Sequence, residues 1–275
     1  MIKKLNARSR LVLSLSLSLG VILAALLLSC LLSESNLATD FSQKSLSPSA
    51  AHPFGTDWLG RDMLTRTLKG LRLSLAVGFT GAFVGACIAA ILGVMAATFG
   101  KKADAVIAWF IDMFIGMPHL VFIILISFIA GGGIKGVILG VGLTHWPSLT
   151  RIIRNEVLSV KNSEYIKLSR NLGKSRLFVV SQHILPHILP QIMVGFLLLF
   201  PHAIIHEASI TFLGFGLSVQ TPSIGLILSE AVNHISVGHW WLALFPGLLL
   251  ILIVKSFDAI GEQFRLIIDP SGANQ

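Results

Sequence analysis

Two histidines and a glutamate form the most chemically capable group in this sequence, because they interrupt a segment that is otherwise apolar. His202 and His206 are four residues apart, so a helix places both imidazole rings on one face. Imidazole nitrogens bind divalent transition metals, and Glu207 follows the pair directly. Two ligands from a single helix would hold a metal ion only transiently, as a site that must release its cargo requires. The spacing alone also fits a structural pair that neighbouring helices or water hydrogen-bond.

A second group of charges is predicted to pair across two apolar segments. Asp112 lies near the start of one segment, while Arg151 and Arg154 follow the end of another. Ionisable side chains are costly inside apolar segments and usually pair with one another. We therefore expect an ion pair that latches the ends of these segments, and we expect Pro118 to bend the helix beyond Asp112.

The sequence contains only incomplete versions of enzyme motifs. Gly173-Lys174-Ser175 resembles the end of a phosphate-binding loop, but Leu168 stands where that loop needs a glycine. The glycines of residues 131–136 match a dinucleotide-binding spacing, but they join two apolar segments. The sequence also lacks a nucleophile elbow, an HExxH pair and a paired acidic cluster, so we do not expect intrinsic catalysis.

The composition indicates a membrane protein. Of the 275 residues, 54% are hydrophobic and 12% are charged, whereas soluble domains carry roughly 25% charged residues. The mean hydropathy is +0.81, so membrane lipid must surround most of the chain. The net charge of +8 is typical of cytoplasmic loops in a membrane protein. The polar segments are too short for a DNA-binding domain, so we expect no nucleic-acid partner.

Apolar segments near the length of a membrane-crossing helix, roughly 20 residues, predict an all-α integral membrane protein. The sequence predicts six transmembrane helices, of which the fourth and sixth are short: 11–32, 73–99, 106–130, 134–150, 188–205 and 240–254. Residues 210–228 are only moderately apolar and contain three glycines and a proline. We interpret them as a broken, partly re-entrant segment or an interfacial loop.

Small residues recur every four positions in the second predicted helix. Gly81, Gly85, Ala89 and Gly93 fall on one helical face, which permits close approach of another backbone. The pattern therefore predicts helix packing within a bundle rather than a ligand site.

The distribution of Lys and Arg sets the expected orientation. Residues 1–10 carry four of them and no acid, residues 151–187 carry seven against two Glu, and residues 208–239 carry none. Because these residues concentrate in cytoplasmic loops, both termini and the 151–187 loop are predicted to be cytoplasmic. One segment disagrees, since four basic residues precede the second predicted helix on the expected outer side: Arg61, Arg66, Lys69 and Arg72.

The 151–187 loop has the pattern of a short docking helix. Tyr165, Leu168 and Leu172 are spaced i, i+3, i+7, which gives a helix with one apolar stripe. Gly173 then ends the helix, as a glycine commonly does. Such a helix either lies at the membrane interface or inserts its stripe into a groove on a cytoplasmic partner.

Three separated motifs resemble those of the C-type permeases in the peptide/nickel family of ABC importers. Residues 164–173 and His183-Ile184-Leu185-Pro186 are similar to the E-A-A-x3-G loop and the H-x-L-P that follows it. Gly173 and H-x-L-P match, whereas residues 167–169 depart from the three name-giving residues. Residues 52–62 are similar to the signature H-P-x-G-T-D-x-x-G-R-D, and residues 209–216 to the run L-S-F-L-G-L-G.

The resemblance, which runs from His52 to Pro270, implies a type I ABC-importer permease fold and the passive half of a pump. It implies a second homologous permease subunit, two cytoplasmic ATPase subunits that use ATP and Mg²⁺, and an extracytoplasmic binding protein that delivers the ligand. No cofactor is then expected on this chain itself. The expected location is the bacterial cytoplasmic (inner) membrane.

The resemblance also divides the chain and assigns coupling to one short helix. Coupling to the ATPase falls to a helix at about 162–177, through Glu164, Tyr165, Leu168, Leu172 and Gly173. The expected divisions are a tail, first helix and external loop (1–72), a core transmembrane domain (73–258) and a cytoplasmic tail (259–275).

The transported ligand stays open between two classes. The H-x3-H pair and His145-Trp146 look like the nickel branch, so nickel or a nickel chelate is the expected ligand. In this interpretation His202 and His206 are transient metal ligands of the translocation path and Glu207 is a charge at its outer mouth. Peptide permeases usually carry small or aliphatic residues at the pair and an acid near Glu207, so di- or oligopeptide is the alternative. A secondary transporter is a third class, but the sequence lacks the internal repeat that this class favours.

Overall fold

The computed structural model describes residues 7–218 and 221–268, and its regular elements are helices joined by turns and one isolated bridge. The all-α class is therefore confirmed. A π-helical turn at 180–184 joins α8 to α9. The helices are α1 (Ala7–Leu31), α2 (Met63–Thr98), α3 (Lys101–Gly116), α4 (His119–Ile129), α5 (Gly133–Gly142), α6 (Trp146–Lys161), α7 (Glu164–Asn171), α8 (Arg176–Val179), α9 (Leu185–Phe212), α10 (Ile224–Ile235) and α11 (Trp241–Ile268).

Four helices of the described chain are long and apolar enough to cross a membrane: Leu11–Leu31, Met63–Thr98, Arg176–Phe212 and Trp241–Ile268. A fifth crossing is added if α3 and α4 count as one broken span. The predicted count of six is therefore not confirmed. The predicted fourth span, 134–150, divides between α5 and the start of α6, which are separated by a turn at residues 143–145.

Several helices are longer than their apolar runs predict. The boundary predicted at residue 72 falls inside α2, and the predicted tail from residue 259 is helical as far as Ile268. Charged residues interrupt the apolar pattern at both places, but a helix can continue beyond the lipid with polar side chains. Residues 1–6 and 269–275 of the predicted tails lie outside the described residues.

Two predicted interruptions are present. Between α3 and α4 the axis turns by 102°, and Pro118 at this point cannot donate a backbone hydrogen bond and disfavours helical geometry at Met117. In the predicted broken segment 210–228, α9 ends at Phe212 and a turn follows in which Gly214 has a φ of +85°. The short apolar helix α10 then begins at Ile224.

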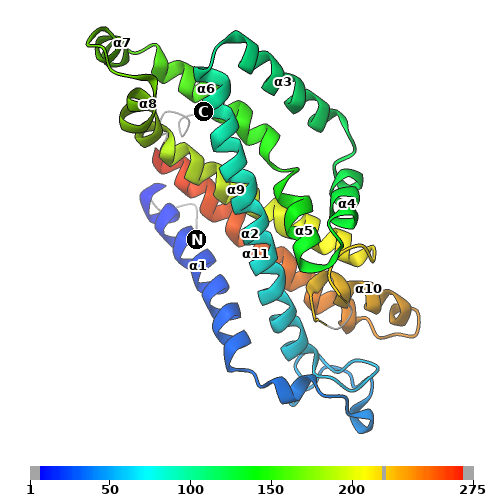
Figure 1. Ribbon diagram of the computed structural model, residues 1–275. Helices are drawn as coiled ribbons and strands as arrows, with labels where there is room; N and C mark the ends of the chain where they lie inside the picture. The colour runs from blue at the N-terminus through cyan, green and yellow to red at the C-terminus, as the bar shows by residue number, and fades with distance from the viewer. Residues whose placement is uncertain (1–6, 219–220, 269–275) are drawn as a thin grey trace.

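Figure 1 shows the helices gathered around α2, which runs the length of the molecule. The start of α1, the end of α11 and the short helices α7 and α8 lie toward one end. The loop of residues 32–62 and α10 lie toward the other end. α1 packs along α11, while α6 and α9 pack on α2.

Glycines on α2 let two neighbouring helices approach closely, as the four-residue spacing predicts. A Cβ added to Gly81 would lie 2.8 Å from Val141 of α5, and one added to Gly93 would lie 2.8 Å from Ile153 of α6. A Cβ on Gly85 would lie 3.3 Å from the Gly142 carbonyl oxygen. We call these three glycines the glycine seam. Since lipid does not drive helices together hydrophobically, such close packing supplies much of the cohesion in a membrane bundle.

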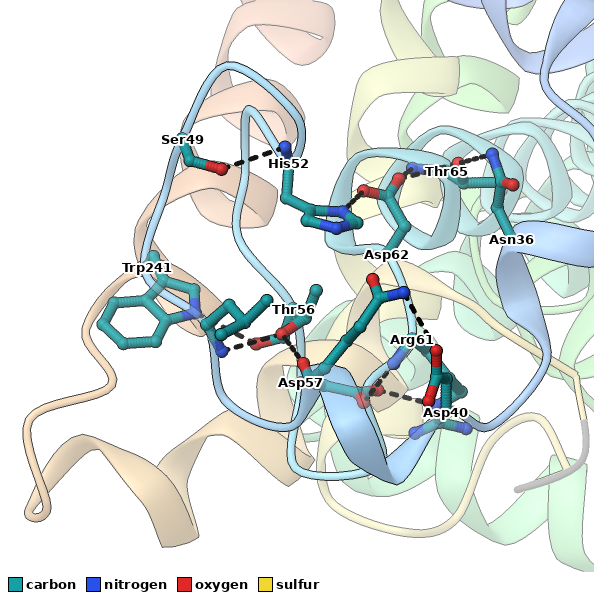
Figure 2. A network of polar contacts seen from close by, with 12 residues as sticks. Asn36, Asp40, Ser49, His52, Thr56, Asp57, Arg61, Asp62, Thr65 and Trp241 are labelled. Atoms are coloured by element: carbon teal, nitrogen blue, oxygen red, sulfur yellow. Dashed lines mark hydrogen bonds and ion pairs between the residues drawn. The ribbon is translucent and has the colours of Figure 1, made fainter.

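Buried ion pairs fasten the 32–62 loop to the start of α2 (Figure 2). Asp57 is fully buried and accepts hydrogen bonds from the backbone N–H groups of Leu59 and Arg61 at 2.8 and 3.0 Å. Its carboxylate also pairs with the side chains of Arg61 at 2.7 Å and Arg66 at 3.0 Å. Arg66 pairs in addition with Glu230 of α10. The carboxylate is therefore well compensated despite its burial.

This network accounts for the basic residues that disagreed with the expected orientation. Arg61 and Arg66 are neutralised by Asp57 and Glu230, and Lys69 lies 3.7 Å from a Glu34 oxygen. The segment therefore carries less free positive charge than its Lys and Arg count indicates.

The 52–62 motif is also explained by its local geometry. His52 lies 3.1 Å from Asp62, which caps α2 by accepting from the Thr65 N–H at 2.8 Å (Figure 2). Gly55 and Gly60 have φ values of +71° and +78°. A Cβ on either would lie within 2.7 Å of a backbone carbonyl oxygen. The motif thus specifies the structure of the loop.

A large side chain within the glycine seam is predicted to destabilise the protein, whereas the same substitution at a glycine without close neighbours is not. Gly93→Leu would force a side chain against Ile153 and the Thr150 carbonyl oxygen. The free energy of unfolding should fall by about 1–3 kcal/mol, as is usual for overpacking. The measurement is the thermal unfolding midpoint of the detergent-purified protein. Gly20→Leu in α1 is the matched control, since a Cβ there meets nothing within 4 Å. Equal midpoints for the two variants would contradict close packing at the seam.

Candidate functional site

A cavity of about 460 Å³ opens between the α3–α4 break, the start of α6 and the middle of α9. Much of its wall is apolar, with Phe114, Leu149 and Leu198 among the lining residues. Ser148 and Thr144 add hydroxyl groups. Four histidines from these elements also line it: His119, His145, His202 and His206.

Three of these histidines meet, although they come from distant parts of the sequence. The ring centroids of His119, His145 and His206 are 4.6 to 5.0 Å apart. One ring nitrogen of each lies within 4.8 Å of those of the other two. His119 begins α4 directly after the Pro118 break, and His145 lies in the break between α5 and α6. We call this group the histidine cluster.

One member of the histidine cluster is fixed in a defined tautomer. His145 is 6% exposed, and its Nδ1 lies 2.8 Å from the Val141 carbonyl oxygen. A carbonyl oxygen can only accept, so Nδ1 carries the proton and Nε2 keeps a free lone pair. His145 Nε2 and His206 Nδ1 are both buried without a hydrogen-bond partner within the described part of the chain.

The predicted path residues lie in different surroundings. His206 belongs to the histidine cluster, whereas His202 is exposed on the same cavity wall outside it. Glu207 is fully buried and accepts a hydrogen bond from Thr211 at 3.1 Å. It is not among the residues that line this cavity, so its predicted role as a charge at the outer mouth stays a prediction. Helical geometry separates it from His206, because successive residues of a helix point about 100° apart.

The predicted latch residues form two separate ion pairs. Arg151 lies 2.7 Å from Asp112, and both side chains are largely exposed. Arg154 instead holds Asp104 through two contacts of 2.5 and 2.6 Å. Sequence analysis assigned both arginines to Asp112 and missed Asp104, which lies in the first turn of α3. The two pairs join α3 to α6.

The predicted docking helix is present as α7, and its apolar stripe is uncovered. Tyr165, Leu168 and Leu172 are 47%, 60% and 70% exposed. The face next to the stripe is anchored, since Ile166 is fully buried and Ser169 lies 3.2 Å from the His183 ring. Sequence analysis did not assign that anchoring face.

The two polar ends of α7 are also defined. Glu164 lies 2.9 Å from Lys167, and both are exposed. Gly173 follows α7 with a φ of +79°, and a Cβ there would meet nothing within 4 Å. Position 173 therefore requires glycine because of its positive φ, and not because a neighbouring atom leaves too little room for a side chain.

Comparison with known proteins identifies the family. Residues 89–265 match the family described as "Binding-protein-dependent transport system inner membrane component". This stretch is more than half of the chain. The chain belongs to this family. It is a permease subunit of an ABC importer and not an enzyme, because the family's ATPase lies in separate subunits.

Curated relatives of this permease carry peptide names. It is 34% identical to the dipeptide transport system permease protein DppC of Bacillus subtilis, over 83% of this chain and 72% of that protein. It is also 34% identical to the oligopeptide permease OppC of Haemophilus influenzae, over 84% and 75%. The glutathione permease GsiD of Pectobacterium atrosepticum is 33% identical, over 84% and 76%.

Solved structures confirm the type I importer permease fold. A chain of the MetNI methionine ABC transporter, in an inward-facing conformation, matches with a TM-score of 0.60. The match covers 75% of this chain and 97% of that chain. At 17% identity it shows the fold alone.

No pattern in the sequence singled out His119, and His145 was singled out only by the resemblance of His145-Trp146 to the nickel branch. Both had one local signal, a nearby proline that marks a helix break or start: His119 follows Pro118 directly, and His145 lies two residues before Pro147. Their convergence on His206 had no signal in the spacing, since it depends on how three helices pack.

The turn after α7 yields a test of coupling in the assembled importer. Gly173→Val places a branched side chain at positive φ, which should displace α7 and lower ligand-stimulated ATPase activity toward the unstimulated rate. The measurements are ATPase activity with loaded binding protein and permease level in the membrane.

Gly131→Val is the matched control, because Gly131 has a φ of +88° and equally open surroundings but lies between α4 and α5. Normal stimulation in Gly173→Val, or an equal loss in Gly131→Val, would count against a docking role for α7.

Proposed function

We propose that this permease forms half of the path for di- or oligopeptides in an ATP-driven importer. The observation that carries the substrate class is the peptide naming of relatives that are 33–34% identical over most of their length. The proposal takes the alternative that the sequence left open in preference to free nickel.

The chemistry of the cavity agrees with a peptide. Its apolar walls can accommodate side chains of varied shape, and Ser148 and the histidines other than His145 can donate hydrogen bonds to peptide carbonyl or carboxylate oxygens. The volume of about 460 Å³ belongs to one subunit, so a homologous second permease would close the rest of the path.

Coupling to ATP hydrolysis is proposed to run through α7. Leu168 and Leu172 of the stripe are 60% and 70% exposed, while Tyr165 is 47% exposed beside the His183 ring. Such a surface suits a groove on an ATPase subunit. Two such ATPases would bind ATP and Mg²⁺, so this chain would need no cofactor. An extracytoplasmic binding protein would deliver the peptide.

The orientation and the latch are parts of the same proposal. The start of α1, the end of α11 and α7 lie toward one end of the molecule (Figure 1), which agrees with termini in the cytoplasm of a bacterium. The pairs Asp112–Arg151 and Asp104–Arg154 lie on α3 and α6, which both border the cavity. They would hold these helices together while the path is closed.

Uptake by whole cells tests the substrate class. Deletion of this subunit should abolish uptake of tritiated di- and oligopeptides, and a plasmid copy of the wild-type chain should restore it. Uptake of radioactive free nickel should be unchanged. A second copy with His187→Gln serves as the expression-matched control, since His187 is a half-exposed residue outside the cavity. If the deletion strain still takes up peptides but loses uptake of nickel, the proposed substrate is nickel and not peptide.

A further inference from the structure

We propose that His119, His145 and His206 form a divalent transition-metal site that accepts a metal ion brought by the cargo. The proposal rests on the proposed peptide path and narrows its substrate to peptides that travel as metal complexes. It replaces the predicted ligand pair on α9 by three ligands from three elements, of which only His206 was in that pair.

The positions of the three nitrogens suit one metal ion. A tetrahedral ion with nitrogen ligands at about 2.0–2.1 Å needs nitrogens about 3.4 Å apart. The three nitrogens already lie within 4.8 Å of one another. His119 and His206 are only partly buried, so their rings can close the remaining gap by small rotations. Imidazole ligands suit Ni²⁺, Cu²⁺ and Zn²⁺.

The second observation is the state of the nitrogens themselves. Metal-binding histidines usually donate their other ring N–H to a backbone carbonyl or carboxylate, which fixes the tautomer. His145 makes this contact with the Val141 carbonyl oxygen at 2.8 Å. Its Nε2 and His206 Nδ1 remain buried and unpartnered within the described residues, a costly state that a ligand would relieve.

The charge balance indicates cargo rather than a resident cofactor. The residues that line the cavity include no acidic side chain, and Glu207 is buried away from it. Three neutral imidazoles leave the double positive charge of the ion to the remaining donors, and an anionic donor on the cargo would compensate it. A peptide supplies such a donor through its carboxylate. Three protein ligands also leave a coordination position open to the cavity, as exchangeable sites require.

The test is metal binding to the complete importer, purified in detergent without a polyhistidine tag. Co²⁺ is the probe, because nitrogen ligands give it visible absorption bands. We expect these bands in the wild-type importer. His145→Gln and His206→Gln should each weaken Co²⁺ binding by about tenfold or more. His187→Gln on the same helix α9 should leave binding unchanged, and size-exclusion profiles confirm that each variant assembles.

The outcomes separate this inference from the proposed function. Absence of the bands in the wild type, or equal Co²⁺ affinity in His145→Gln and His187→Gln, overturns the metal site. If peptide uptake persists in that case, the proposed peptide path stands without a metal site. If peptide uptake does not depend on this subunit but the importer still binds Co²⁺, only the proposed peptide substrate is overturned.

Discussion

Close approach of helices to the glycine seam of α2 is the constraint on which the rest of the structure depends. Gly81, Gly85 and Gly93 leave room for α5 and α6 to lie against α2 at backbone distance. Gly85 also lies against His145, whose Cβ would be 3.4 Å from an added Cβ. The seam therefore sets the position of the α5–α6 break, and with it one wall of the cavity. Larger side chains on this face of α2 would separate the helices that carry the histidines.

Breaks in membrane helices free backbone groups that lipid cannot satisfy, so such breaks must provide their own partners. At the α5–α6 break, Thr144 donates to the Gly140 carbonyl oxygen at 2.8 Å and Trp146 Nε1 donates to the Leu143 carbonyl oxygen at 3.0 Å. His145 Nδ1 adds a contact of 2.8 Å to the Val141 carbonyl oxygen, which also accepts from the backbone N–H groups of Thr144 and His145. The side chain that makes this contact is thus the one whose Nε2 is buried without a partner within the described residues. A ligand bound by the histidine cluster would therefore lie directly beside the α5–α6 break.

Sequence patterns predicted what depends on neighbours along the chain. The glycine spacing on α2, the bend at Pro118 and the stripe on α7 were correct because each follows from one element. Helix ends were less predictable, since an apolar run marks the extent of lipid and a helix continues beyond it. The ion pair between Asp104 and Arg154 and the approach of His119 to His206 depend on tertiary packing, and no spacing in one sequence reports it.

We expect the histidine-lined cavity to lie on the path of the transported ligand. Incorporation of a photo-crosslinking amino acid tests it directly in the assembled importer supplied with labelled peptide and loaded binding protein. Ser148 is exposed on the cavity wall, while Ile91 of α2 is 60% exposed outside it. If the cavity lies on this path, labelled peptide should crosslink to position 148 in an ATP-dependent way and should not crosslink to position 91. Absence of peptide at position 148, or equal labelling at both positions, would contradict it.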